Sequence, residues 1–123
     1  MPDYRRGSHS IYDIRYHFVW VTKYRYHVLT GEVARRARTL IRQTCLALEV
    51  EIQRGHVSKD HVHILVSCPP TLSPAMVMKQ VKGRSSRLLQ KEFQHLRRRY
   101  WGRHFWARGY FCATAGRATD EQI

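Results

Sequence analysis

The stretch KDHVHILV, residues 59–66, reads as a buried β-strand, and the rest of the chain can be organised around it. Side chains in a strand alternate between two faces, so His61 and His63 project from the same face. The opposite face carries only aliphatic side chains and is expected to pack beneath helices. We therefore predict that the two histidines stand on the side of the sheet away from the helices, close enough to share one metal ion.

The same pattern has a second interpretation. Two histidines at positions i and i+2 of an apolar strand are often half-buried residues that hydrogen-bond within the protein and bind no metal. These eight residues alone leave both interpretations open.

The composition indicates one domain, residues 1–123, with an affinity for polyanions. The chain has 22 Lys and Arg against 9 Asp and Glu, a formal net charge of +13 and a pI near 10.4. Such a surface attracts nucleic acid. Basic and aromatic residues alternate at residues 24–26 and 99–101, which suits bases stacked on rings beside neutralised phosphates. A membrane surface is disfavoured because no basic amphipathic helix lies at a terminus.

Other compositional features exclude several protein classes. No segment approaches the ~20 apolar residues of a membrane span and no signal segment opens the chain, so we expect a cytoplasmic protein. Cys45, Cys68 and Cys112 are widely spaced and form no C-x-x-C pair. They are expected to be reduced packing residues, without a disulfide or a zinc site.

The chain before the histidine strand predicts an arm and a strand. Residues 1–10 are polar and are expected to form a flexible arm. Residues 11–22 alternate as a strand, which places Arg15 and His17 on the face of the histidine pair. We expect His17 to be a hydrogen-bonding partner of that pair.

Two helices and two further strands complete the pattern. Thr30 is the candidate N-cap of a helix that runs to about residue 48, and Ser73-Pro74 open a helix that runs to about residue 96. Residues 49–57 predict a strand with Arg54 on the face of Ile52 and a bulge or bend at Gly55. Residues 109–114 predict the last strand.

The order strand, helix, strand, strand, helix, strand predicts an α+β fold of the ferredoxin-like (RRM-like) type. In this plan both helices cover one face of an antiparallel sheet, and the first and third strands are central neighbours. A third helix is expected to begin at Thr119, because residues 119–123 contain a capping box, and to continue beyond Ile123.

Several segments together resemble one known family over nearly the whole chain. They are YHFVWVTKYR at 16–25, DHVHIL at 60–65, KxxKGxS at 79–85, WG at 101–102, FW at 105–106 and GYF at 109–111. The chain resembles the small single-strand DNA transposases of the insertion-sequence 200/605 family, the one-tyrosine HUH transposases.

The resemblance implies a chemistry for the histidine pair. His61 and His63 match the family's His-hydrophobic-His motif, which binds a divalent metal, magnesium or manganese, that polarises the scissile phosphate. A tyrosine then attacks, leaving a 5′-phosphotyrosine link and a free 3′-hydroxyl, with no nucleotide cofactor. The alignment places that tyrosine and a glutamine metal ligand beyond Ile123. The chain as given is therefore expected to bind DNA without cutting it, as a shortened or a decayed transposase.

The resemblance also implies partners. The family works as a homodimer on single-stranded DNA whose element ends are marked by hairpins. Charge and position give the candidate DNA contacts Arg15, Lys23, Arg25, Lys79, Lys82, Arg84 and Arg87. Two alternatives are a non-catalytic ferredoxin-like nucleic-acid-binding domain and an HUH replication initiator or relaxase.

Overall fold

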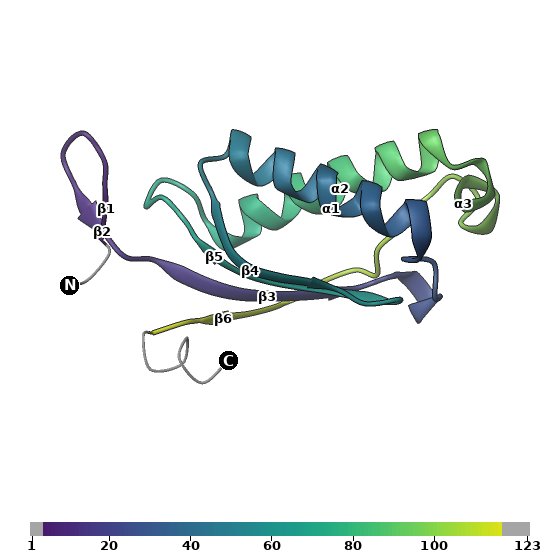
Figure 1. Ribbon diagram of the computed structural model, residues 1–123, viewed down its shortest axis with the longest axis horizontal. Coiled ribbons are helices and arrows are strands. Elements are labelled where there is room, and N and C mark those ends of the chain that lie inside the picture. The colour runs from purple at the N-terminus through teal and green to yellow at the C-terminus, as the bar shows by residue number, and fades with distance from the viewer. Residues whose placement is uncertain (1–3, 117–123) are drawn as a thin grey trace.

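The computed structural model of the protein describes residues 4–116. Figure 1 shows two helices lying side by side over one face of an antiparallel sheet, with the other face turned away from them. The elements in chain order are β1 (Arg5–Arg6), β2 (Ile11–Tyr12), β3 (Arg15–Val21), the 3-10 turn η1 (Lys23–Arg25), α1 (Gly31–Ala47), β4 (Glu51–Val57), β5 (His61–Ser67), α2 (Pro74–Glu92), α3 (Gln94–Arg99) and β6 (Phe111–Thr114).

The main sheet has the strand order β4-β5-β3-β6, and every neighbouring pair is antiparallel. The first and third strands of the predicted plan are thus the central neighbours β3 and β5. This arrangement confirms the α+β, ferredoxin-like prediction. The predicted start of a third helix at 119–123 lies outside the described residues.

The core lies between the sheet and the two helices. Phe18 and Trp20 of β3 and Val62 of β5 are at most 1% exposed. They pack against the apolar stripes of α1 and α2, including Leu40 and Val81, both 0% exposed. Burial of these side chains is the main favourable term in folding, and it fixes which face of β5 points outward.

The helix starts follow the capping rules in part. The Ser73 hydroxyl accepts a hydrogen bond from the backbone N–H of Met76 at 3.1 Å, and Pro74 occupies the first helical position. Thr30 stands at the N-cap position of α1, but its side chain makes no capping hydrogen bond. None of the helices in residues 4–116 is both long enough and apolar enough to cross a membrane.

Part of the segment predicted to be a flexible arm, residues 1–10, is paired with the chain that follows it. β1 pairs with β2 in a short hairpin, so the predicted strand 11–22 divides and β3 begins at Arg15. Arg5 also donates to the backbone oxygens of Ser67 at 2.9 Å and Glu49 at 2.8 Å. These long-range bonds tie the hairpin to the main sheet, which a local pattern cannot reveal.

Two further boundaries differ from the predictions. The second helix breaks at Phe93, whose φ of −119° and ψ of 97° are extended, so α2 ends at Glu92 and α3 follows as a separate element. In β4 the register shifts between Ile52 and Arg54, which leaves Gln53 as the extra residue of a β-bulge. The bulge therefore lies before Gly55, and Arg54 faces the histidine side instead of sharing the face of Ile52.

Candidate metal centre and nucleic-acid interface

The histidine pair lies in the middle of the sheet. His61 is opposite Val21 and His63 is opposite Val19 in the β3–β5 ladder. The intervening Val62 is fully buried in the core, so both imidazoles stand on the face away from α1 and α2. This placement agrees with the alternation of residues 59–66.

Asp60 orients the His61 ring. The Nδ1 atom of His61 lies 2.9 Å from Asp60 Oδ1, and Asp60 Oδ2 accepts a hydrogen bond from Arg25 Nε at 3.0 Å. These hydrogen bonds, first that from His61 and then that from Arg25, lower the pKa of the Asp60 carboxyl. A carboxylate on Nδ1 fixes the tautomer that presents Nε2 to a metal, so this arrangement fits a metal ligand.

His63 is held by a second histidine. His63 Nε2 lies 3.2 Å from Nδ1 of His17, which is 8% exposed. Burial, reinforced by His17, His61 and His56, lowers the pKa of His63 and favours the neutral imidazole that metals bind. The prediction that His17 is a hydrogen-bonding partner of the pair is confirmed. The Nε2 atom of His17 itself has no hydrogen-bond partner among the described residues.

The described residues do not form a complete set of metal ligands. Within residues 4–116 no group of three or more His, Cys, Asp or Glu side chains is arranged to hold a metal ion. A cavity of about 230 Å³ adjoins His63 and is also lined by His17 and His56. Two imidazoles with an open side fit a divalent ion whose other ligands come from elsewhere, such as phosphate oxygens.

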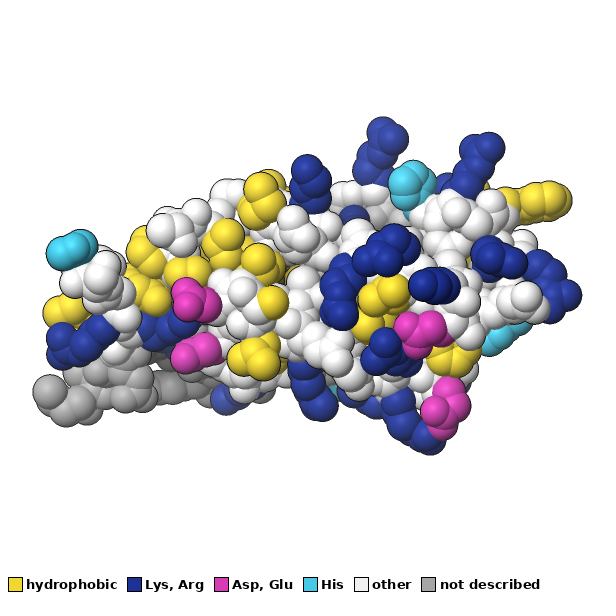
Figure 2. All heavy atoms as spheres, turned by 90° about the horizontal axis from the view of Figure 1, so that it is seen from above, with side chains coloured by type: hydrophobic (Ala, Val, Ile, Leu, Met, Phe, Trp, Pro, Cys, Tyr) yellow, Lys and Arg dark blue, Asp and Glu magenta, His cyan; other side chains and the backbone are white. Residues whose placement is uncertain are grey.

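A much larger cavity, which we call the basic pocket, lies between α2, α3 and the loop that precedes β6. Its volume is about 790 Å³, and its lining contains Lys and Arg side chains and no Asp or Glu. The lining residues are Lys23, Lys82, Gly83, Ser86, Arg87, Gln90, Lys91, Arg97, Gly102, Arg103, His104, Trp106, Ala107 and Arg108. Figure 2 shows Lys and Arg side chains gathered on the helix-bearing side toward the end of the molecule where α3 lies.

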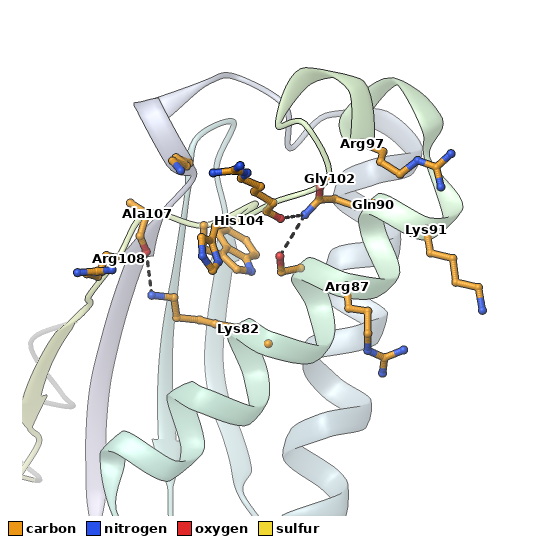
Figure 3. Close-up of a pocket in the computed structure, with 14 residues that line it drawn as sticks. Lys82, Arg87, Gln90, Lys91, Arg97, Gly102, His104, Ala107 and Arg108 are labelled. Carbon is orange, nitrogen blue, oxygen red and sulfur yellow. Dashed lines mark hydrogen bonds between the residues drawn. The ribbon is translucent and has the colours of Figure 1, made fainter.

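Three of the predicted DNA contacts meet in the basic pocket: Lys23, Lys82 and Arg87. Figure 3 shows Lys82 reaching across from α2 to Ala107. The Lys82 ammonium donates to the backbone oxygens of Ala107 at 2.8 Å and Gly109 at 2.7 Å, and burial lowers its pKa. Lys82 therefore anchors the wall of the pocket, while Arg87 is exposed and available to a phosphate.

The other four predicted contacts lie elsewhere. Arg15 is 8% exposed and forms an ion pair with Asp13 at 3.1 Å, which argues against a role in binding DNA. Arg25 is paired with Asp60 beside the histidines. Lys79 is exposed on α2 but does not line the basic pocket.

Arg84 joins the two long helices. Its guanidinium donates to the Thr44 hydroxyl at 3.2 Å, to the Gln43 side-chain oxygen at 3.0 Å and to the Leu40 backbone oxygen at 3.4 Å. All three acceptors belong to α1, so the charge of Arg84 serves the packing of α1 on α2.

We expect Arg84→Met to lower the free energy of unfolding by about 1–2 kcal/mol, because it removes hydrogen bonds that each contribute about 0.5–1.5 kcal/mol. The affinity of this variant for DNA should stay within about twofold of that of the parent protein. Urea denaturation and fluorescence anisotropy measure the two quantities. Arg87→Met, one turn along α2, is the matched control and should show the reverse pattern. Loss of DNA affinity in Arg84→Met with unchanged stability would contradict the packing role.

Several residues of the basic pocket were not among the predicted contacts: Lys91, Arg97, Arg103 and Arg108. The charge run at 97–99 and the basic residues scattered through 103–108 were visible in the sequence. Charge alone does not show that this loop folds back against α2, which depends on bonds such as that from Phe105 N–H to the Ser86 hydroxyl at 3.2 Å.

Comparison with known proteins identifies relatives along the chain. A family model described as "Transposase IS200 like" matches residues 10–123. The transposase for insertion sequence element IS200 of Salmonella typhimurium is 34% identical over 119 residues, which cover 97% of this chain and 78% of that protein. The ISDra2 transposase TnpA of Deinococcus radiodurans is 32% identical, with 97% and 85% covered.

Solved structures agree with these relatives. A crystal structure of a protein described as a transposase from Deinococcus radiodurans R1 has a TM-score of 0.83 and 31% identity, and the match covers 96% of this chain and 91% of that one. The REP-associated tyrosine transposase, solved bound to a REP hairpin, has a TM-score of 0.66 at 16% identity, with 99% and 67% covered, and shares the fold. With the family model matched from residue 10 onward, this chain belongs to the IS200-like transposases.

Proposed function

We propose that this protein acts on single-stranded DNA, which it nicks and rejoins at hairpin-marked element ends through a 5′-phosphotyrosine intermediate. The observation that carries the proposal is the basic pocket, a cavity of about 790 Å³ walled by lysines and arginines in a chain of a transposase family. Phosphates provide most of the affinity in such interfaces, since each neutralised phosphate releases condensed counterions.

The basic pocket suits the backbone of a folded strand. Arg87 and Lys91 project from successive turns of α2, while Arg97 and Arg108 come from α3 and the following loop. A cavity lined from separate elements by one sign of charge attracts a polyanion such as the phosphate backbone. The hairpin of the REP-associated transposase gives no further support, because at 16% identity that protein shares only the fold.

In this proposal His61 and His63 hold a divalent metal, magnesium or manganese. Such an ion, when bound, polarises the scissile phosphate and offsets the charge that develops on it. Asp60 keeps the Nδ1 side of His61 occupied, and His17 positions His63 from β3. Two nitrogen ligands suit manganese better than magnesium, which prefers oxygen ligands. With either metal, phosphate oxygens of the DNA would complete the ligand set.

The proposed nucleophile is a tyrosine expected beyond residue 123. Its oxygen forms a bond to phosphorus as the P–O3′ bond breaks; the tyrosine loses its proton, and the 3′-oxygen leaves as a hydroxyl after gaining one. The tyrosines of the core are poorly suited to this attack. Burial raises the pKa of Tyr100 to about 12 and raises that of Tyr16, so both phenols resist ionisation.

The test is DNA binding by the chain as it stands. We expect a labelled hairpin with a single-stranded flank to bind more tightly than an unstructured strand of the same length, with affinity that falls as salt rises. Fluorescence anisotropy across a salt series measures both. Equal affinity for the hairpin, the unstructured strand and heparin would mean that the basic pocket binds any polyanion, and it would overturn the proposal. Sedimentation of the complex would test the homodimer that we also propose.

A further inference from the structure

Two aromatic side chains lie exposed beside the basic pocket and have no role in the proposed chemistry. Tyr24 is 69% exposed and Trp101 is 87% exposed. They line one cavity of about 470 Å³, whose other walls are Lys23, Tyr26, Arg99, Tyr100 and Arg103. Every charged residue of this cavity is again basic. Exposed apolar surface that is contiguous and rimmed by polar residues can mark a binding site.

The backbone holds both rings in an unfavourable conformation. Tyr24 has a φ of 61° and Trp101 a φ of 56°, in the left-handed region that favours glycine. Trp101 follows the end of α3, where its N–H bonds to Arg98 O at 3.3 Å and the N–H of Gly102 bonds to Arg97 O at 2.7 Å. This is a Schellman motif with tryptophan at the position that glycine usually occupies. Strain of this kind concentrates at functional sites.

A chain of ring contacts connects Tyr24 to the core. The Tyr24 ring lies 5.4 Å from Tyr26, which lies 5.7 Å from Tyr100, and Tyr100 lies 5.3 Å from the fully buried Phe105. The Arg99 guanidinium sits 4.0 Å from the centre of the Tyr26 ring. Tyr24 is therefore packed against rings that continue into the core, and it presents aromatic surface next to positive charge.

We propose that Tyr24 and Trp101 form a stacking site for an unpaired base of the DNA strand whose phosphates occupy the basic pocket. This inference rests on the proposed function and adds a residue-level site to it. Lys23 and Arg103 line both cavities, so one strand can pass from one to the other without leaving positive charge. Aromatic faces beside cations are the usual means of holding unpaired bases.

The protein contains its own probe for this site. Of its three tryptophans, Trp20 is 1% exposed and Trp106 is 3% exposed, so acrylamide quenches mainly Trp101. A single-stranded oligonucleotide should quench the fluorescence of Trp101 and shield it from acrylamide. An oligonucleotide of the same length with abasic sites keeps the phosphates and should do neither.

Affinity provides the second measurement. Trp101→Ala and Tyr24→Ala should each lower the affinity for the oligonucleotide by about tenfold, as expected for the loss of one stacked base. Trp101→Phe should retain most of the affinity, and Leu46→Ala, an exposed apolar residue on α1, should retain all of it. Trp101→Gly relieves the left-handed strain, so it should melt no lower than the parent and still lose the affinity.

The outcomes separate this inference from the proposed function. One outcome would disprove the stacking site and leave the proposed function standing. In that outcome the strand binds and Arg87→Met lowers its affinity, but the Trp101 variants bind it as the parent protein does and the abasic strand behaves like the intact one. If no strand binds, the proposed function fails first. If Trp101 becomes shielded as protein concentration rises without DNA, the surface is an interface between protein molecules and the stacking site is overturned.

Discussion

Replacing both His61 and His63 by alanine should weaken manganese binding by about a hundredfold or more. The two imidazoles are the only nitrogen ligands of the proposed site, and loss of an orienting partner alone costs about 10- to 100-fold at such sites. Asp60→Asn should therefore give an intermediate loss of about tenfold, because it disturbs the Nδ1 contact of 2.9 Å to His61 while leaving both ligands in place. Electron paramagnetic resonance of the free ion, with and without a single-stranded oligonucleotide, measures the affinity.

The control for these variants is His95→Ala. His95 is an exposed histidine on α3, remote from the β5 face, so its loss should not change manganese binding. Unchanged binding in the double variant would end the metal-site interpretation and favour a structural role for the pair. The measurement with the oligonucleotide adds a second check. Phosphate oxygens are expected to complete the ligand set, so the oligonucleotide should tighten manganese binding in the parent protein and not in the double variant.

Reversing two charges in the basic pocket should have the largest effect on DNA. Arg87→Glu with Lys91→Glu removes two phosphate contacts and places two carboxylates against the strand. We expect affinity for hairpin DNA at 0.1 M salt to fall by about a hundredfold. The negative slope of log affinity against log salt should become shallower by about 0.9 for each lost contact. Fluorescence anisotropy over a salt series measures both.

The α1 helix offers a matched control. Arg38 and Arg42 are exposed, have the same four-residue spacing as Arg87 and Lys91, and lie outside the basic pocket. Reversing their charges changes the net charge by the same amount, so any long-range effect of charge is equal in both proteins. If the α1 double variant loses as much affinity as the α2 variant, binding follows net charge and the basic pocket is not the site.

The sequence predicted the histidine face well because the period of a strand leaves few choices. Once Val62 and Ile64 are in the core, His61 and His63 must face the other way. The antiparallel pairing of the two central strands then brings His17 within 3.2 Å of His63. This part of the site depends on local alternation and on a topology that the order of elements specifies.

The rest of the site depends on contacts that no local pattern encodes. Arg84 and Arg87 look alike on the basic face of α2, yet one is held by α1 and the other is exposed to solvent. Arg15 has a charge that suits DNA but lies buried beside Asp13. Charge patterns indicate which partner a surface attracts, whereas long-range packing decides which of the charges reach that partner.

The bulge at Gln53 has a consequence for the protein at high concentration. β4 is an outer strand of the main sheet, and the outer strand of any sheet presents unpaired amides on which another molecule can add a strand. The extra residue interrupts that row and twists it, which hinders the stacking of copies into fibrils. Deleting Gln53 would restore a regular ladder, so we expect the deletion to make this edge more prone to strand addition by another copy.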